Sequence, residues 1–248
     1  QNGVTLNDSM TTAGTTTINA DTNGDGTGDF TIAAGKNLNS GSNALSITAN
    51  DVDLSGTINS VAAATTILVS DGGTIGLGAT AGDMTISGAE LQNITATGLT
   101  IGDTSAGNIT VNGIAAANSN NISGTTTLVA GSNGATVTFA TAASTFNALS
   151  ASGDDRVIVN VGITTDTGDL ALDGDLDNAA DTNDDITIAA GLTLTSADAI
   201  ILDATNSGIS ASGALTLTAQ NGVTLNDSLV TGGAAVIDAD SDNNGTGE

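Results

Sequence analysis

Apolar and polar residues alternate in short runs along almost the whole chain. Typical runs are FTI at 30–32, LSI at 45–47, ITV at 109–111 and LTL at 215–217. A period of two, built from β-branched residues and Leu, indicates strands that bury one face. Because no segment carries apolar residues at helical spacing over three turns, the pattern predicts an all-β protein with essentially no helix.

The breaks between the predicted strands are rich in Gly and Asn. These two residues tolerate left-handed backbone angles, which sharp corners require. Asn-Gly pairs begin at Asn2, Asn112 and Asn133, and such pairs are also typical of β-hairpins. An antiparallel sandwich is therefore the alternative to any parallel architecture.

Short modules recur at distant places in the chain. Residues 30–38 (FTIAAGKNL) are echoed by residues 186–194 (ITIAAGLTL), and residues 45–49 (LSITA) by residues 215–219 (LTLTA). Interchangeable modules predict a parallel β-helix, or β-solenoid, in which each coil stacks on the previous one. We expect about 20 residues per coil, roughly 11 coils, and a rise of about 4.8 Å per coil.

The largest repeat spans most of the chain. Residues 1–9 (QNGVTLNDS) reappear unchanged as residues 220–228, and 17 of the 29 positions aligned from there are identical. Residues 1–219 are therefore predicted to be one solenoid unit, and residues 220–248 the start of the next copy, with no separate globular domain. We interpret the chain as a window of a longer tandem protein.

Composition narrows the function classes. The chain has 27 acidic and 2 basic residues, a net charge of −25, which argues against nucleic-acid binding because Lys and Arg supply the affinity for phosphate. No apolar run is long enough to span a membrane, so we expect no membrane insertion. With three Phe as the only aromatic residues, the core must be thin and filled mainly by Val, Ile, Leu, Ala and Thr.

Catalysis is not expected. The chain lacks His and Cys, so the common nucleophiles and acid–base residues are missing. Asp154, Asp155 and Arg156 form the only acid–Arg cluster, and no aromatic residue stands near them in the sequence. We interpret this cluster as a local charge pair on a loop, with a polysaccharide-degrading site as the alternative.

The first acidic segment resembles half of a calcium-binding loop. Its candidate ligands are Asp21, Asn23, Asp25 and Asp29. Ca²⁺ takes six to eight oxygen ligands, and Gly26 stands at the sixth place, where the loop must turn sharply. Because Ile32 occupies the place of the usual bidentate Glu, we expect a calcium turn between strands. A solvated acidic corner without a metal is the alternative.

Two further segments are candidates for Ca²⁺. The counterpart of the first turn in the second copy keeps oxygen-bearing side chains at Asp240, Asp242, Asn244 and Glu248. A separate cluster contains Asp173, Asp175, Asp177 and Asp181. Clustered carboxylates repel one another unless a cation or hydration compensates, so calcium is a hypothesis at both places.

Two segments resemble filamentous-haemagglutinin-like repeats, which occur in very large secreted bacterial surface proteins. They are residues 213–228 (GALTLTAQNGVTLNDS) and residues 43–56 (NALSITANDVDLSG). The resemblance implies a right-handed parallel β-helix and an extracellular or cell-surface location, in an adhesin, a surface fibre or a biofilm matrix. The 219-residue repeat and the Asp-rich turns depart from the general pattern of that family.

These observations together predict a structural repeat of a giant extracellular β-solenoid fibre or matrix filament. Such a repeat is expected to self-associate end to end or laterally. The alternatives are the stalk of an adhesin that binds glycans, and a surface-layer lattice protein.

Overall fold

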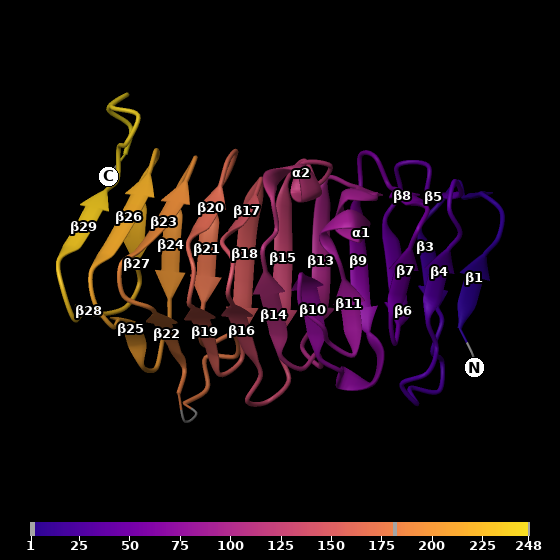
Figure 1. Ribbon diagram of the computed structural model, residues 1–248, viewed down its shortest axis with the longest axis horizontal. Helices are drawn as coiled ribbons and strands as arrows, with labels where there is room; N and C mark the ends of the chain where they lie inside the picture. The colour runs from indigo at the N-terminus through magenta and orange to yellow at the C-terminus, as the bar shows by residue number, and fades with distance from the viewer. Residues whose placement is uncertain (1–2, 181–182, 248) are drawn as a thin grey trace.

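The chain folds into an elongated β-solenoid with its two ends at opposite extremes of the long axis (Figure 1). The computed structural model describes residues 3–180 and 183–247. Within these ranges, the strands named below pair only in parallel. The predicted parallel architecture is therefore confirmed and the antiparallel sandwich is excluded, whereas the right-handed coil stays a prediction.

Each coil has three faces, which the chain visits in the order face 1, face 2, face 3. Face 3 is one nine-stranded sheet, whose strands lie side by side along the axis (Figure 1). They are β3 (Thr16–Asn19), β6 (Leu45–Ala49), β9 (Ala64–Val69), β13 (Gly98–Asp103), β15 (Thr125–Ala130), β18 (Ala148–Gly153), β21 (Leu170–Asp173), β24 (Ile200–Asp203) and β27 (Val223–Leu225).

Face 1 is a three-stranded sheet followed by an eight-stranded one, and β11 of the second contacts β7 of the first. The first sheet contains β1 (Val4–Leu6), β4 (Phe30–Ile32) and β7 (Val52–Leu54). The second contains, in spatial order, β11 (Met84–Ile86), β10 (Ile75–Gly78), β14 (Ile109–Asn112), β16 (Thr136–Phe139), β19 (Arg156–Val159), β22 (Asp185–Ile188), β25 (Gly208–Ala211) and β28 (Leu229–Thr231).

Face 2 is a four-stranded sheet followed by a five-stranded one. The first contains β2 (Met10–Thr11), β5 (Asn37–Asn39), β8 (Thr57–Asn59) and β12 (Ile94–Thr95). The second contains β17 (Ser144–Phe146), β20 (Ile163–Thr165), β23 (Leu192–Ser196), β26 (Leu215–Ala219) and β29 (Ala235–Asp238).

Among the described residues, helix occurs only at corners near the middle of the solenoid. The helices are α1 (Gly88–Gln92), α2 (Ala116–Ser119) and a 3₁₀ turn at Ser70–Gly72. Ser87 is the N-cap of α1: its side chain accepts a hydrogen bond from the backbone N–H of Glu90, and the Glu90 carboxylate accepts one from the backbone N–H of Ser87. In the described part of the chain, neither short helix has the length or apolarity needed to cross a bilayer.

Successive strands pair in register, so each inward residue stacks on the inward residue of the previous coil. Ile47 pairs with Ile67, which pairs with Ile101, and all three are fully buried. The three Phe residues are also fully buried. One continuous hydrophobic cluster runs the length of the molecule, which confirms the expected thin core of mainly aliphatic side chains.

Outward positions stack in the same way and form rows of like residues. On face 3, Thr66, Thr100 and Thr127 follow one another on consecutive strands. On face 2 the row contains Thr145, Thr164, Thr195 and Thr218. Parallel, in-register stacking therefore repeats side-chain chemistry along the axis on the outside as well as the inside.

Coil length on face 3 is close to the predicted 20 residues for half of the coils and longer for the others. Leu45 pairs with Thr65, an offset of 20 residues, but Ala64 pairs with Gly98, an offset of 34. Face 3 consequently holds nine strands, fewer than the expected 11 coils. The 34-residue coil contains the additional strand β11 and helix α1. The corners also vary, from two residues between β6 and β7 to eleven between β21 and β22.

Replacing Phe139 by Ala should strongly destabilise the solenoid. Its side chain is fully buried on face 1, and truncating a buried Phe leaves a cavity that costs about 3–5 kcal/mol. Denaturant unfolding measures this change in the free energy of unfolding. The neighbouring outward residue gives the matched control: Thr138→Ala should change it by less than about 0.5 kcal/mol. Equal effects of the two substitutions would contradict the assigned inward and outward faces.

Candidate functional site: the acidic corners

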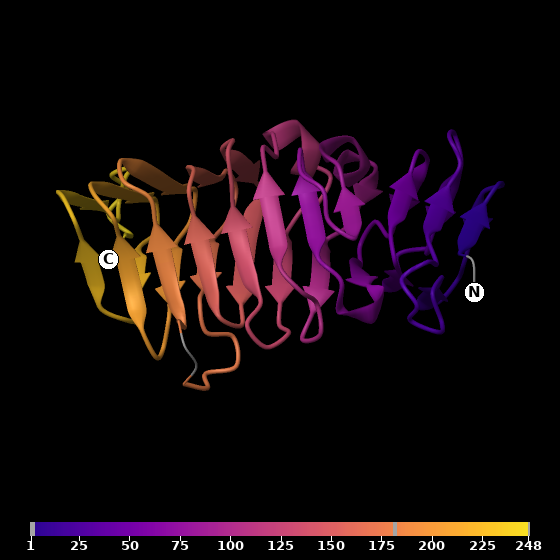
Figure 2. The ribbon, with the colours of Figure 1, turned by 60° about the horizontal axis from the view of Figure 1, so that its bottom comes forward.

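The described candidate ligands of the first copy lie at corners that lead from face 3 to face 1. Asp21, Asn23, Asp25 and Asp29 stand between β3 and β4. Asp173 ends β21, and Asp175 and Asp177 follow it in a corner that protrudes at the lower edge of Figure 2. Because β3 and β21 are six strands apart on face 3, about 29 Å separates the two groups. The structure therefore does not bring them together.

Asp21 anchors the first acidic turn from inside. Its side chain is 3% exposed and accepts hydrogen bonds from the backbone N–H of Gly26 (3.0 Å) and the hydroxyl of Ser70 (2.7 Å). The Ser70 hydrogen bond is the main reason that the pKa of Asp21 lies below its ordinary value. Because Ser70 follows β9, this carboxylate connects the corners of the first and third coils.

The other candidate ligands of this turn bond to nearby groups. The carboxylate of Asp25 accepts from the Thr27 hydroxyl and from the side-chain amide of Asn23, and these bonds lower its pKa. Asp29 accepts from the side-chain amide of Asn50 in the next coil (3.1 Å). Donors within the protein thus already occupy oxygens that a cation would use.

The backbone geometry explains why two Gly residues of the turn are the same in both copies. Gly26 and Gly245 have φ of 70° and 81°, the left-handed region in which a side chain is strained. At Gly28 and Gly247 a Cβ atom would come within 2.3 Å and 1.8 Å of the carbonyl oxygens of residues 20 and 239. These close approaches leave no room for any side chain.

The second copy of the turn has the same geometry. Asp240 accepts from the backbone N–H groups of Gly245 (3.0 Å) and Asn244 (3.0 Å), as Asp21 does from Gly26 and Asp25. Asp242 accepts from the side-chain amide of Asn244 (2.7 Å). The repeated sequence therefore encodes a repeated hydrogen-bonded turn. The candidate ligand Glu248 lies outside the described residues.

The second acidic cluster holds carboxylates that burial disfavours. Asp175 is 1% exposed; one of its oxygens accepts from the side chain of Asn206 (2.6 Å), and the other is buried and has no donor among the described residues. Burial, with the charges of Asp184 and Asp177 nearby, raises the pKa of Asp175. The pKa of Asp173 is also raised, mainly by burial. The candidate ligand Asp181 lies outside the described residues.

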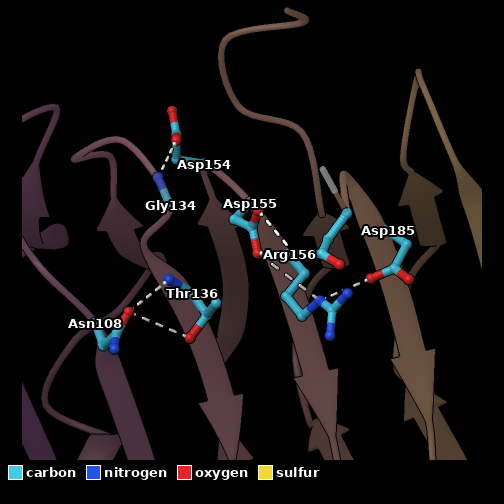
Figure 3. A network of polar contacts seen from close by, with 8 residues as sticks. Asn108, Gly134, Thr136, Asp154, Asp155, Arg156 and Asp185 are labelled. Atoms are coloured by element: carbon cyan, nitrogen blue, oxygen red, sulfur yellow. Dashed lines mark hydrogen bonds and ion pairs between the residues drawn. The ribbon is translucent and has the colours of Figure 1, made fainter. Parts of the chain in front are cut away.

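Arg156 lies between two carboxylates near this cluster (Figure 3). Its Nε atom is 3.0 Å from Asp185 Oδ1 and 4.0 Å from Asp155 Oδ2. The N–H is not aligned with Asp185, so this contact is an ion pair and not a hydrogen bond. Asp154 points away from Arg156 and accepts from the backbone N–H of Gly134 (2.8 Å). These contacts hold neighbouring coils together. The expected absence of catalysis stays a prediction.

Pairs of Asn and Asp from neighbouring corners form a feature that sequence reasoning missed. In each pair, an Asn side-chain amide donates to an Asp carboxylate 21–31 residues earlier in the chain: Asn50 to Asp29, Asn183 to Asp155, Asn206 to Asp175, Asn221 to Asp198 and Asn226 to Asp203. An Asn one coil after an Asp is the signal for such a pair. Reading that signal requires the coil length, which varies too much to be taken from the sequence.

Ca²⁺ can bind Asn side chains and backbone carbonyls as well as carboxylates, so the carboxylates of the described residues do not test the calcium prediction by themselves. Among the described residues, no three carboxylates gather closely enough to hold one metal ion, and Ca²⁺ needs six to eight oxygens. Calcium therefore stays a prediction. A calcium titration followed by the melting temperature tests it, because a bound ion stabilises the folded state by mass action. An unchanged melting temperature would argue against the site.

Comparisons with protein-family models, with curated proteins and with solved structures found no match. The resemblance to filamentous-haemagglutinin-like repeats accordingly stays an expectation. What the chain does must be inferred from its own geometry.

Replacing Asp21 by Asn should lower the melting temperature at pH 7. The amide nitrogen of Asn cannot accept a hydrogen bond, so a buried donor loses its partner. Because the folded pKa of Asp21 is lowered, its contribution is present above pH 3.8 and is lost as the pH falls through the folded pKa. The difference between wild type and D21N should therefore shrink in acid. Asp240→Asn is the control, since this turn makes no contact with Ser70; an equal loss in D240N would contradict the anchoring role.

Replacing Asp175 by Asn should have the opposite effect and raise the melting temperature at pH 7. The raised folded pKa means that this carboxylate's contribution is fully present below pH 3.8 and is lost as the pH rises through the folded pKa. Asn keeps an acceptor for the Asn206 amide but carries no charge. The gain in melting temperature should therefore disappear below pH 3.8, where the wild-type carboxyl group is also uncharged. The exposed neighbour provides the control, and Asp177→Asn should change the melting temperature less. A destabilised D175N would contradict the unfavourable burial of this charge.

Proposed function

We propose that this chain is a section of an extracellular β-solenoid fibre, whose function is mechanical. The observation that carries this proposal is the boundary at residue 220. There the second copy continues the stack in all three faces, as β27 pairs with β24, β28 with β25 and β29 with β26. A solenoid that runs from one unit into the next without a linker supports a continuous rod.

Parallel stacking supplies the stiffness of such a rod. Backbone hydrogen bonds run along the axis on each face, and each contributes about 0.5–1.5 kcal/mol net. The single core cluster extends along the same direction, so bending would separate apolar rows as well as hydrogen bonds. The net charge of −25 repels neighbouring rods and keeps them dispersed.

The composition of the surface supports an extracellular place for the fibre. Lys36 and Arg156 are the only basic residues, and the three Phe are buried, so proteases that cut at basic or aromatic residues find few sites. The chain has no Cys and needs no redox control. Both properties suit a long-lived material outside the cell.

Electron microscopy of chains with one, two and three tandem units tests the proposal. Because a unit adds eight to nine coils, the rod should lengthen by about 40 Å for each unit at constant width. The matched control carries a flexible Gly/Ser insertion between residues 219 and 220, which should convert the rod into jointed segments. Separate globules in the uninterrupted chain would overturn the fibre. Two-dimensional arrays would favour the surface-layer alternative, and a rod ending in a glycan-binding tip would favour the adhesin stalk.

A further inference from the structure

The two copies of the repeated sequence lie on different faces of the solenoid. The strand β1, which reads VTL, lies on face 1 and pairs with β4. Its duplicate β27 has the same three residues but lies on face 3 and pairs with β24. Identical sequence has therefore been placed on a different side of the molecule.

The same displacement applies to the whole first coil of each copy. The strand β2 lies on face 2 and its counterpart β28 on face 1; β3 lies on face 3 and its counterpart β29 on face 2. One repeat unit, residues 1–219, thus contains eight complete coils and two further faces. Each counterpart is shifted by one face in the same direction.

The alternating pattern permits this displacement because it specifies inside and outside but not the face. Residues 45–49 and 215–219 form β6 on face 3 and β26 on face 2, and both show the same alternation of buried and half-buried positions. Such a module fits two faces equally well. The number of strands that precede it in the chain therefore decides on which face it lies. The faces are interchangeable at the level of sequence.

The displacement also moves the acidic turn to another corner. In the first copy, Asp residues recur along the corner from face 3 to face 1, which we call the acidic edge: Asp21, Asp51, Asp71, Asp103, Asp154 and Asp203. Asp240, the duplicate of Asp21, follows β29 and therefore lies at the corner that leaves face 2. In Figure 1 the turn of the first copy lies at the lower edge and that of the second at the upper edge.

We infer that consecutive units of the solenoid are rotated by one face, about one third of a turn, so that the acidic edge changes corner in each unit and returns after three. This inference rests on the proposed tandem fibre. Three units contain 26 coils, so the charge pattern should recur every 125 Å or so at about 4.8 Å per coil. A fibre built in this way carries its negative charge on all sides.

Cysteine cross-linking in the 248-residue chain tests the rotation, because the chain has no Cys of its own. In the described arrangement Ile201 and Thr224 are outward, in-register neighbours on β24 and β27. Parallel neighbours are close enough for a disulfide, so the variant I201C/T224C should oxidise to an intramolecular disulfide. If β27 instead lay on face 1, as β1 does, its neighbour would be β25, and S210C/T224C should cross-link.

The double variant S46C/T66C is the positive control, because these residues are in-register neighbours within the first copy. We expect I201C/T224C to reach the cross-linked fraction of this control and S210C/T224C to stay at background, as measured by mass spectrometry of the monomer. Cross-linking of S210C/T224C, or of neither test pair while the control reacts, would overturn the rotation. Because these disulfides form within one molecule, the result is independent of rod formation: a rotated chain that formed no rods would refute the fibre alone.

Discussion

In-register parallel stacking is the constraint on which the rest of this structure depends. Each residue must suit the same environment as the residue one coil earlier, so buried rows such as Ile47, Ile67 and Ile101 continue from strand to strand. Three short faces enclose a narrow interior, which leaves room for aliphatic side chains and for only a few larger ones. The scarcity of aromatic residues is therefore a consequence of the cross-section, and the alternating pattern is a consequence of the stacking.

The same constraint creates an electrostatic problem on the outside. Stacking places like side chains together, as when Asp173 pairs in register with Asp203, and the chain has only two basic residues to compensate 27 acidic ones. Uncharged hydrogen-bond donors stabilise these carboxylates. Asn amides from the next coil, Ser and Thr hydroxyls and turn N–H groups bond the carboxylates, which stabilises the charged form without adding a positive charge. Where the effect of burial outweighs the donors, as at Asp175, the pKa is raised.

The sequence allowed strands, inward faces and parallel stacking to be predicted, because all three follow from local alternation and from repeated modules. Coil length could not be predicted, since a corner of two residues and one of eleven both join β-strands of similar pattern. The candidate acidic turns were located correctly as corners, but their internal bonds depend on residues one or two coils away. Asp21 bonds to Ser70, 49 residues later, and no local pattern indicates that partner.

The duplication of the unit shows which shifts between copies a β-solenoid tolerates. A shift of one residue would turn every inward side chain outward and destroy the core. A shift of one whole strand keeps every inward residue inside and only changes the face, which is what separates β1 from β27. Duplication of a segment therefore needs to preserve the alternation across its boundary, but it does not need to contain a whole number of coils. A unit of 219 residues that ends two thirds of the way around a coil satisfies this requirement, because the three faces accept the same modules.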